Sequence, residues 1–197
     1  RFLLDPYTAI TSGTENPTLG VVVECPGYDG FVGMGTVRFN KVQYNGEIVP
    51  HAFLDGLKVH KDFRGQGLGY QIATWRVQKA REAYGDECVI ATGMLQENIA
   101  SQAVARKWCR EFVEPAFDVL IVPTRRQQPK NPAGIIVREL ETQDYEEFAA
   151  MQNRFYQHYN LYPVSDANSI ASARNIAAEG RKPYRFFAAT DSHGNLL

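Results

Sequence analysis

The most informative stretch of this chain is VHKDFRGQGLGYQIATW, residues 59–75. Three glycines, Gly65, Gly67 and Gly69, fall within a span of five residues, and Arg64 stands just ahead of them. Apolar, strand-like sequence precedes the glycines, and a helix-like run follows them. Because glycine has no Cβ, successive N–H groups can turn inward, and the N-terminus of the following helix adds partial positive charge. The stretch therefore predicts an anion-binding loop suited to a pyrophosphate.

Two other phosphate loops do not match this spacing. A P-loop needs Gly-Lys-Ser/Thr after its last glycine, whereas Gly69 is followed by Tyr70 and Gln71. A dinucleotide-binding fingerprint needs Gly-x-Gly-x-x-Gly and, about 20 residues on, an acidic residue at the end of a strand, whereas Glu87 opens one. A glycine-rich turn that binds nothing is the remaining alternative. The coincidence of Arg64 and a preceding strand with the glycines favours a ligand.

The sequence around the loop predicts an alternation of strands and helices. Apolar and β-branched runs bounded by turn residues indicate strands, and Asn45-Gly46 is a hairpin signal. The predicted strands are 18–25, 31–39, 51–60, 87–95 and 117–123, and the predicted helices are 68–84, ended by Gly85, and 98–112. Residues 1–18 are predicted to be loop. The expected inward stripe of the first helix is Leu68, Ile72, Trp75 and Lys79, with Arg76 off it.

Composition and charge are those of an ordinary globular protein. The chain has 197 residues, 44% of them hydrophobic, and a net charge of -1, so no overall field favours nucleic acid or an anionic membrane. The cysteines, Cys25, Cys88 and Cys109, form no Cys-x-x-Cys pair. No run reaches the ~20 apolar residues that span a bilayer, and no signal-peptide pattern opens the sequence. We therefore expect a cytoplasmic protein with reduced thiols, no metal, and no nucleic-acid or membrane partner.

Residues 59–75 resemble the GNAT superfamily of acyl-CoA-dependent acyltransferases. The mark of that family, Arg/Gln-x-x-Gly-x-Gly/Ala, is matched by Arg64, Gly67 and Gly69. The resemblance extends over residues 18–123. It implies the GNAT fold, an α/β (α+β) domain with a mixed central sheet, flanking helices and a strand pair that splays apart at the CoA site. It also implies acetyl-CoA as the co-substrate and no metal.

The resemblance carries over cofactor-binding residues by position. The backbones of Leu57 and Val59 would bind the acyl and pantetheine parts of acetyl-CoA, and Asn98 would contact pantetheine near the splay. The pyrophosphate would lie on the loop that follows Arg64, at the amides of Gly65, Gln66, Gly67, Leu68, Gly69 and Tyr70.

Asp55 is the candidate catalytic base. Side chains alternate along a strand, so its even spacing from Leu57 and Val59 predicts that all three share one face. The resemblance implies a base or water relay on this face, since some GNAT members place a histidine or a carboxylate there. His51, on the same predicted face, is the backup. The alternative, that Asp55 only hydrogen-bonds a neighbouring loop, stays open.

The sequence offers no clear general acid. Many GNAT members have a tyrosine seven residues after the asparagine, and that position is Ala105 here. Tyr70 and Tyr84 lie on the other predicted helix, and Cys109 has no evident histidine partner that would make it a nucleophile. Either another group protonates the leaving thiolate, or none is needed, or the domain does not turn over.

The last third of the chain resembles the opening of a second GNAT domain. Residues 125–133 are rich in prolines and basic residues and are predicted to be a linker. The predicted elements of residues 134–197 are a strand at 134–140, helices at 141–159 and 166–180, and a strand from 184. We expect a tandem-GNAT protein seen without both ends, whose first domain, 1–124, lacks its opening strand and helices. Alternatively, residues 134–197 supply those elements to a neighbouring chain.

These features favour an N-acetyltransferase that moves an acetyl group from acetyl-CoA to a primary amine by direct attack. The alternative is a catalytically degenerate module that binds CoA as a ligand or structural element, which Ala105 favours. A scaffold that binds no CoA is disfavoured by Arg64 and the glycines. The acceptor would be a small-molecule or peptide amine that the sequence does not identify. A homodimer is left open.

Overall fold

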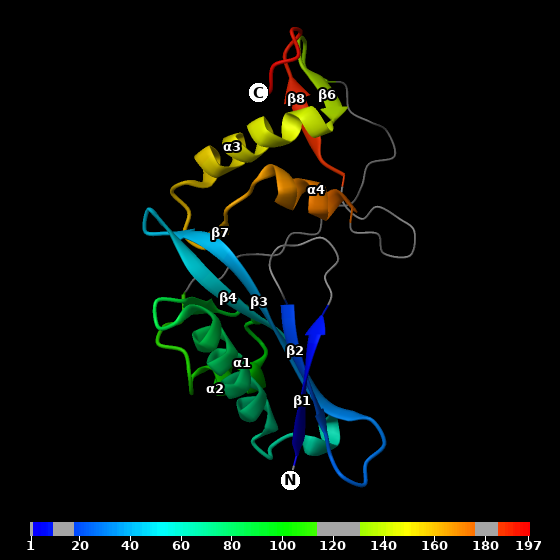
Figure 1. Ribbon diagram of the computed structural model, residues 1–197, viewed down its shortest axis with the longest axis vertical. Coiled ribbons are helices and arrows are strands. Elements are labelled where there is room, and N and C mark those ends of the chain that lie inside the picture. The colour runs from blue at the N-terminus through cyan, green and yellow to red at the C-terminus, as the bar shows by residue number, and fades with distance from the viewer. Residues whose placement is uncertain (1, 10–17, 114–130, 176–184) are drawn as a thin grey trace.

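The computed structural model describes residues 2–9, 18–113, 131–175 and 185–197. Its larger part is a sheet of order β1-β2-β3-β4-β5, in which β1 to β4 are antiparallel neighbours and β5 runs parallel to β4 (Figure 1). The bounds are β1 Leu3–Ala9, β2 Thr18–Glu24, β3 Phe31–Tyr44, β4 Glu47–Val59 and β5 Val89–Ala91. This sheet and its helices confirm the predicted α/β class with a mixed central sheet.

β1 is an edge strand, so the prediction of loop over residues 1–18 is wrong at Leu3–Ala9. Pro6 lies opposite Val21 of β2. An edge strand tolerates proline because the missing N–H can belong to the side that faces away from the sheet. Leu4 packs against the buried core around Val21. β1 therefore forms the edge of the large sheet beside β2.

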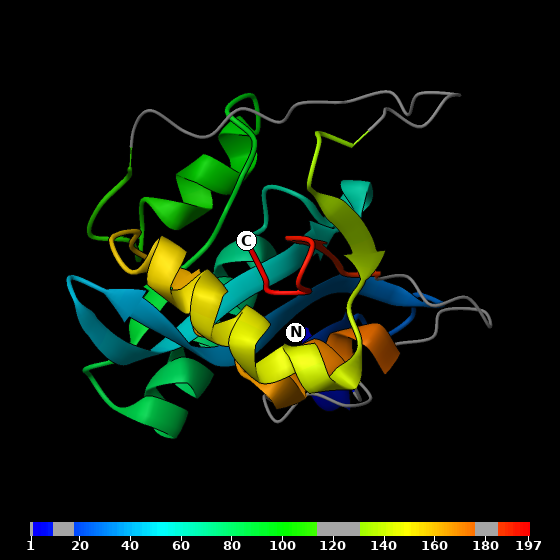
Figure 2. The same ribbon diagram turned by 90° about the horizontal axis from the view of Figure 1, so that it is seen from above.

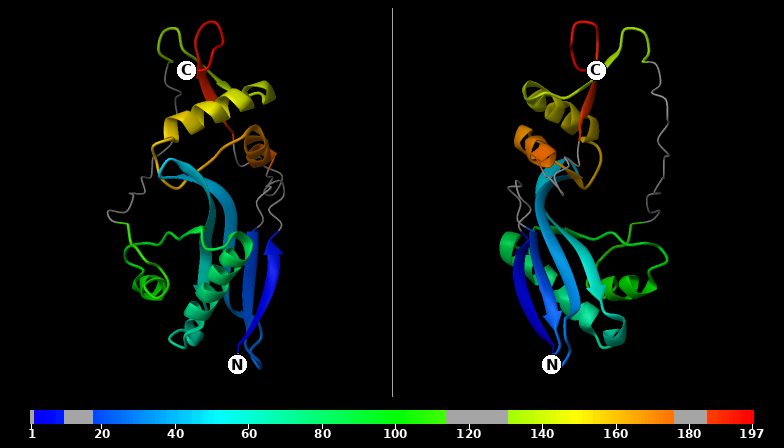
Figure 3. Two further views of the ribbon diagram at one scale, coloured as in Figure 1. Left: turned by 60° about the vertical axis from the view of Figure 1, so that its left-hand side comes forward. Right: turned by 90° about the vertical axis from the view of Figure 1, so that its right-hand side faces the viewer.

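Helix α1, Leu68–Tyr84, lies along one face of the sheet against β3 and β4 (Figure 3). It begins after Gly67, with φ of 79°, and ends at Gly85, with φ of 72°, which confirms the predicted bounds. The helix approaches β3 so closely that a Cβ on Gly35 would lie 2.7 Å from Cγ2 of Ile72. The absence of a side chain at Gly35 is therefore what lets helix and sheet pack together.

Two elements after α1 are shorter than predicted. β5 forms only the middle of the predicted strand 87–95, and α2, Ile99–Ala105, forms the first half of the predicted helix 98–112. Beyond Ala105 the backbone changes to turns. The predicted strand 117–123 lies outside the described residues. Within the described ranges, every helix is too short or too polar to span a bilayer.

The C-terminal unit has its own small sheet and core. Its elements are β6 Ile136–Glu139, the 3-10 helix η2 Thr142–Asp144, α3 Tyr145–Tyr156, α4 Ala167–Asn175 and β8 Phe187–Thr190. β6 and β8 pair antiparallel, and Figure 1 shows the two helices between this pair and the large sheet. The buried core consists of Leu140, Tyr145, Ala149, Ile170 and Ala188. The predicted order of strand, two helices and strand is confirmed, and residues 176–184 lie outside the described part.

Strand β7, Tyr162–Pro163, joins the two units by pairing with β3. β2 pairs with β3 only as far as Arg38, so the same edge of β3 is available at Val42–Gln43, where β7 pairs antiparallel. Beside it, Asn45 and Asn160 exchange hydrogen bonds of 2.7 and 3.0 Å. Figure 2 shows the consequence, with α3 crossing over the strands of the large sheet.

Candidate functional site

The glycine loop connects β4 to α1, after the short 3-10 helix η1, Lys61–Phe63. Gly65 and Gly67 have φ of 77° and 79°, the left-handed region that glycine adopts without strain. Within the described part of the chain, none of the five amides from Gly65 to Gly69 donates a hydrogen bond to the protein. Unpaired N–H groups at the start of a long helix favour an anion. The geometry therefore fits the predicted pyrophosphate loop.

Arg64 and Tyr70 mark the two ends of this donor run. The Tyr70 amide donates to the Gly67 carbonyl at 3.1 Å, so the predicted run of free amides stops one residue earlier, at Gly69. The Arg64 side chain turns back, and its Nε donates to the Val59 carbonyl at 3.2 Å. The start of the loop is thus fastened to the end of β4.

The remaining loop residues anchor the turn in different ways. Leu68 is buried in the core between α1 and the sheet. Gln66 is exposed, and its Nε2 donates to the Asp62 carbonyl at 3.3 Å. Gly69 faces α2, since a Cβ there would lie 3.4 Å from Cγ2 of Val104. The loop therefore lies where the two helices meet.

β4 and β5 separate ahead of the loop. They pair only from His51 to Phe53, and the Thr92 hydroxyl makes one further link to the Leu54 carbonyl at 2.8 Å. From Asp55 onward, β4 has no β5 partner. Within the described part of the chain, no strand pairs with that side of β4 at the residues predicted to bind acetyl and pantetheine.

β4 carries a bulge at Gly56. Thr36 pairs with Asp55 and Met34 pairs with Lys58, so β4 has one residue more than β3 between these two pairs. Gly56 has φ of 63°. One inserted residue reverses the face on which all later side chains of a strand lie.

The bulge separates Asp55 from Leu57 and Val59. Leu54 belongs to a core cluster that includes α1 side chains, and so do Leu57 and Val59. Asp55 therefore lies on the face away from α1, and the prediction that it shares a face with Leu57 and Val59 is wrong. The signal was present in the sequence, because a glycine inside a strand pattern often marks a bulge.

Asp55 lies in a polar, open setting. Its side chain is 54% exposed, its Oδ2 lies 3.2 Å from Arg38 Nη2, and its Oδ1 accepts the Gly56 amide at 2.7 Å. The Arg38 guanidinium in turn lies 5.2 Å from the centre of the Phe53 ring. The partners of Asp55 are therefore a side chain of β3 and the backbone of its own strand, and about half of its side chain is exposed to solvent.

His51, the backup base, is buried on the same face as Asp55. Its Nδ1 lies 2.6 Å from Oδ1 of Asn40, so Nδ1 carries the proton. Its Nε2 is buried without a hydrogen-bond partner within the described residues. Burial, and then the charge of Arg38, lower the pKa of His51 to about 4. His51 is therefore neutral at pH 7 and a weaker base than an ordinary histidine.

Asn98 begins α2, and its Oδ1 accepts the Ser101 amide at 3.1 Å as an N-cap. Its side-chain carbonyl is thereby occupied. Ala105, at the position where the resemblance would place a tyrosine, is buried. Burial raises the pKa of the Cys109 thiol, which disfavours a nucleophilic thiolate. No general acid is thus evident at these positions.

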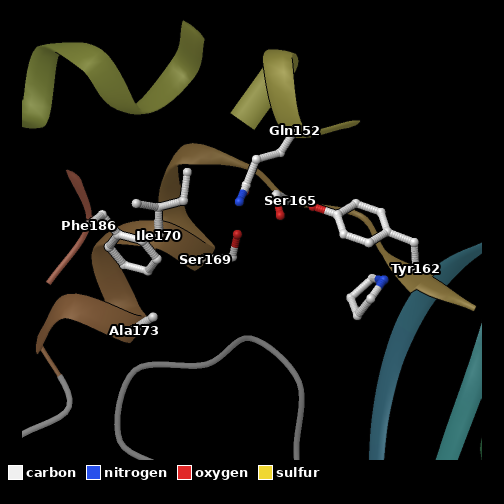
Figure 4. A pocket seen from close by; sticks show the side chains of 8 residues that line it. Gln152, Tyr162, Ser165, Ser169, Ile170, Ala173 and Phe186 are labelled. Atoms are coloured by element: carbon white, nitrogen blue, oxygen red, sulfur yellow. The ribbon is translucent and has the colours of Figure 1, made fainter. Parts of the chain in front are cut away.

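Among the described residues, no cluster of histidine, cysteine, aspartate or glutamate could hold a metal ion. A hollow of about 280 Å³ lies in the C-terminal unit between α3, α4 and β7. Figure 4 shows Gln152 and Ser169 pointing toward one another there, with Tyr162 at one end and Phe186 at the other. No sequence pattern predicted this hollow, and no residue of the glycine loop lines it.

Comparison with known proteins identifies the family. The model of the acetyltransferase (GNAT) family matches residues 6–109, more than half of the chain. The chain therefore belongs to the GNAT acetyltransferase family. No curated protein sequence matches it.

Several solved structures are similar over part of their length. A transcriptional regulator from Bacillus halodurans C-125 is 21% identical, with a TM-score of 0.42. The match covers 53% of this chain and 65% of that protein, so this chain spans less than two thirds of its length. The aminoglycoside N-acetyltransferase AAC(6')-Iy, in complex with a bisubstrate analog, is 23% identical, with a TM-score of 0.42, and the match covers 55% of this chain and 69% of that protein. The aminoglycoside 6'-N-acetyltransferase AAC(6')-IG from Acinetobacter haemolyticus is 18% identical, with a TM-score of 0.42, and the match covers 54% of this chain and 72% of that protein.

Proposed function

We propose that the protein is an N-acetyltransferase that moves an acetyl group from acetyl-CoA to a primary amine. The observation that carries this proposal is the run of five unpaired amides from Gly65 to Gly69, at the end of a strand that has separated from its neighbour. A pyrophosphate on these amides would direct the rest of the cofactor toward the gap between β4 and β5. Family membership supports the same chemistry.

The transfer would occur in one direct step. The amine nitrogen attacks the thioester carbonyl carbon, the C–S bond breaks, and CoA leaves as a thiolate. Backbone N–H groups near Leu57 and Val59 would polarise the carbonyl, and the loop would hold the cofactor in place. Asp55, directly or through a water, would take the proton that the amine loses. Asn98 would contact pantetheine through its amide nitrogen.

A CoA-binding module without turnover is the second candidate. It is favoured by Ala105, a buried methyl group where an acid would be expected. In this case the loop would bind CoA as a ligand or structural element, and no amine would be acetylated.

The proposal also includes the domain bounds, the partners and the cellular location. Residues 1–124 form the acetyltransferase domain, 125–133 a linker, and 134–197 the opening half of a second GNAT-like unit, which the antiparallel β6–β8 pair around α3 and α4 supports. The acceptor is a small-molecule or peptide amine, neither nucleic acid nor membrane is a partner, and the setting is the cytoplasm.

Thermal unfolding with and without acetyl-CoA tests the proposal, followed by an assay of thiol release with a panel of amines. At 100 times the dissociation constant, acetyl-CoA should stabilise the native state by about 2.7 kcal/mol. A shift together with amine-dependent thiol release supports the enzyme. A shift without release on any amine supports the module. No shift would refute both.

A further inference from the structure

Arg76 is buried in the middle of α1 although the helical pattern predicted it off the inward stripe. It is 3% exposed, and it lies on the helix face that packs against β3 and β4. Burying a guanidinium is costly unless its donors are satisfied. The hydrogen bonds of Arg76 therefore indicate what holds it there.

Two of these hydrogen bonds go to the bulge. Arg76 Nη1 lies 3.0 Å from the carbonyl oxygen of Asp55 and 3.4 Å from that of Thr36, the two residues paired at the edge of the bulge. The Thr36 hydroxyl adds a bond of 3.1 Å to the same Asp55 carbonyl. A bulge disrupts the strand ladder locally, and here a helix side chain supplies donors to the carbonyls beside it.

The space for Arg76 is provided by Gly35, which lies opposite the bulge on β3. A Cβ on Gly35 would lie 3.2 Å from both Cδ and Nε of Arg76. Arg76 Nε also donates to the Ile72 carbonyl of its own helix, at 3.4 Å. The guanidinium is thereby held between α1 and the point where β4 changes face.

The buried side chain keeps its charge. Burial lowers the pKa of Arg76 to about 10, and the nearby charge of Asp55 opposes that shift. Arg76 is therefore protonated at neutral pH and retains its donors. No carboxylate among the described residues forms an ion pair with it, so main-chain carbonyls are its direct partners.

We propose that Arg76 is a positioning residue that fixes the β4 bulge. It holds the Asp55 carboxylate on one face of the sheet and the backbone of Leu57–Val59 at the edge of β4 that β5 has left. This inference rests on the proposed function, in which these two groups serve the amine and the thioester. Without Arg76, the loop amides would still bind the pyrophosphate, but the thioester and Asp55 would no longer be held in register.

Arg76→Met and Arg76→Lys test this division. Adenosine 3′-phosphate 5′-diphosphate reports on the loop alone, and acetyl-CoA reports on the loop and the splay together. In Arg76→Met we expect the affinity for the nucleotide to stay within about twofold, the preference for acetyl-CoA over it to fall about fivefold, and kcat to fall about 30-fold. Arg76→Lys, which keeps a charged donor, should recover part of kcat.

Ala80→Gly is the matched control, because Ala80 is buried on the same helix and its methyl group cannot hydrogen-bond the bulge carbonyls. It should weaken the fold while keeping kcat and both affinities. Equal behaviour of Arg76→Met and Ala80→Gly, or wild-type kinetics in Arg76→Met, would overturn the proposal. If Arg76→Met does not fold, unchanged values in Arg76→Lys and Gly35→Ala would do so.

The wild-type protein separates this inference from the proposed function. If it binds acetyl-CoA but acetylates no amine, the fivefold change in preference still decides the role of Arg76. If it binds neither probe, the proposed function is refuted and the positioning role falls with it.

Discussion

Arg38 and Asp55 face one another across β3 and β4, with Nη2 3.2 Å from Oδ2, on the sheet face away from α1. Each side chain is 54% exposed. An ion pair this open contributes at most about 1 kcal/mol to stability. Its importance is geometric, because Arg38 on Oδ2 and the Gly56 amide on Oδ1 orient a carboxylate that remains about half exposed to solvent.

Asp55→Asn should reduce the amine-dependent rate by about a hundredfold, because the amide keeps the shape of the carboxylate but cannot take a proton. The affinity for acetyl-CoA should stay within about twofold, since Asp55 lies on the face opposite Leu57 and Val59. Steady-state kinetics and calorimetry measure the two quantities. Asp86→Asn, an exposed carboxylate beyond the end of α1, is the control. A wild-type rate in Asp55→Asn would remove Asp55 as the base.

Gly67→Glu should abolish acetyl-CoA binding, because it places an anion among the loop amides and strains a residue with φ of 79°. Gly85→Glu is a matched control. Gly85 has φ of 72° and ψ of -164° at the other end of the same helix, whereas Gly67 has ψ of -2°. Glutamate is strained at least as much at Gly85 as at Gly67, and the loop is untouched. Calorimetric titration of both variants checks this. Equal loss in both would mean that strain in α1, and not the charge in the loop, weakens binding.

Local turn chemistry is what made much of the fold predictable. Asn45 and Gly46 have φ of 50° and 87°, as the hairpin signal predicted, and Gly85 ends α1 where the sequence indicated. Both depend on backbone conformations that few other residues adopt. The glycine loop was predictable for the same reason.

Features that depend on distant partners were not predicted. Leu3–Ala9 is a strand because the edge of β2 is available to pair with it, and the sequence of those residues carries no signal of that partner. The bulge at Gly56 was missed because strict alternation was assumed along β4. The burial of Arg76 depends on that bulge, since the carbonyls of Thr36 and Asp55 beside it accept hydrogen bonds from the guanidinium.

Asp144→Asn should destabilise the C-terminal unit by about 2 kcal/mol, because it removes charge-assisted hydrogen bonds from a buried side chain. Arg138 Nη1 and Nη2 both donate to the Asp144 carboxylate, Nη2 at 2.8 Å, and the Glu141 amide donates to it at 2.8 Å. The Arg138 hydrogen bonds are the main reason that the pKa of Asp144 is lowered to about 2. Urea unfolding at pH 7 measures the loss.

The stabilisation from Asp144 is complete above its ordinary pKa of 3.8 and is lost as the pH falls toward 2. The difference between wild type and Asp144→Asn should therefore shrink over this window. Glu146→Gln, an exposed carboxylate one turn into the same helical segment, should leave stability nearly unchanged. A difference that persists undiminished at pH 2 would contradict the role of the ion pair.

His51 should give the large sheet a separate pH dependence. Burial, followed by the charge of Arg38, lowers its pKa from 6.5 to about 4 in the folded chain. Stability is therefore complete above about pH 6.5 and falls as the pH drops toward 4, because in this window only the unfolded chain binds the proton. With about 1.4 kcal/mol for each unit of pKa difference, the loss reaches about 3 kcal/mol near pH 4.

His51→Gln isolates this contribution, because glutamine can still donate a hydrogen bond to Asn40 but does not titrate. Guanidinium unfolding of both proteins between pH 7 and pH 4.5 gives two stability profiles. Carboxylates contribute equally to both, so the difference between the profiles belongs to His51. We expect the variant to be the less stable protein at pH 7 and to lose less stability on acidification. Parallel profiles would mean that the imidazole accepts a proton in the folded protein as readily as in the unfolded chain.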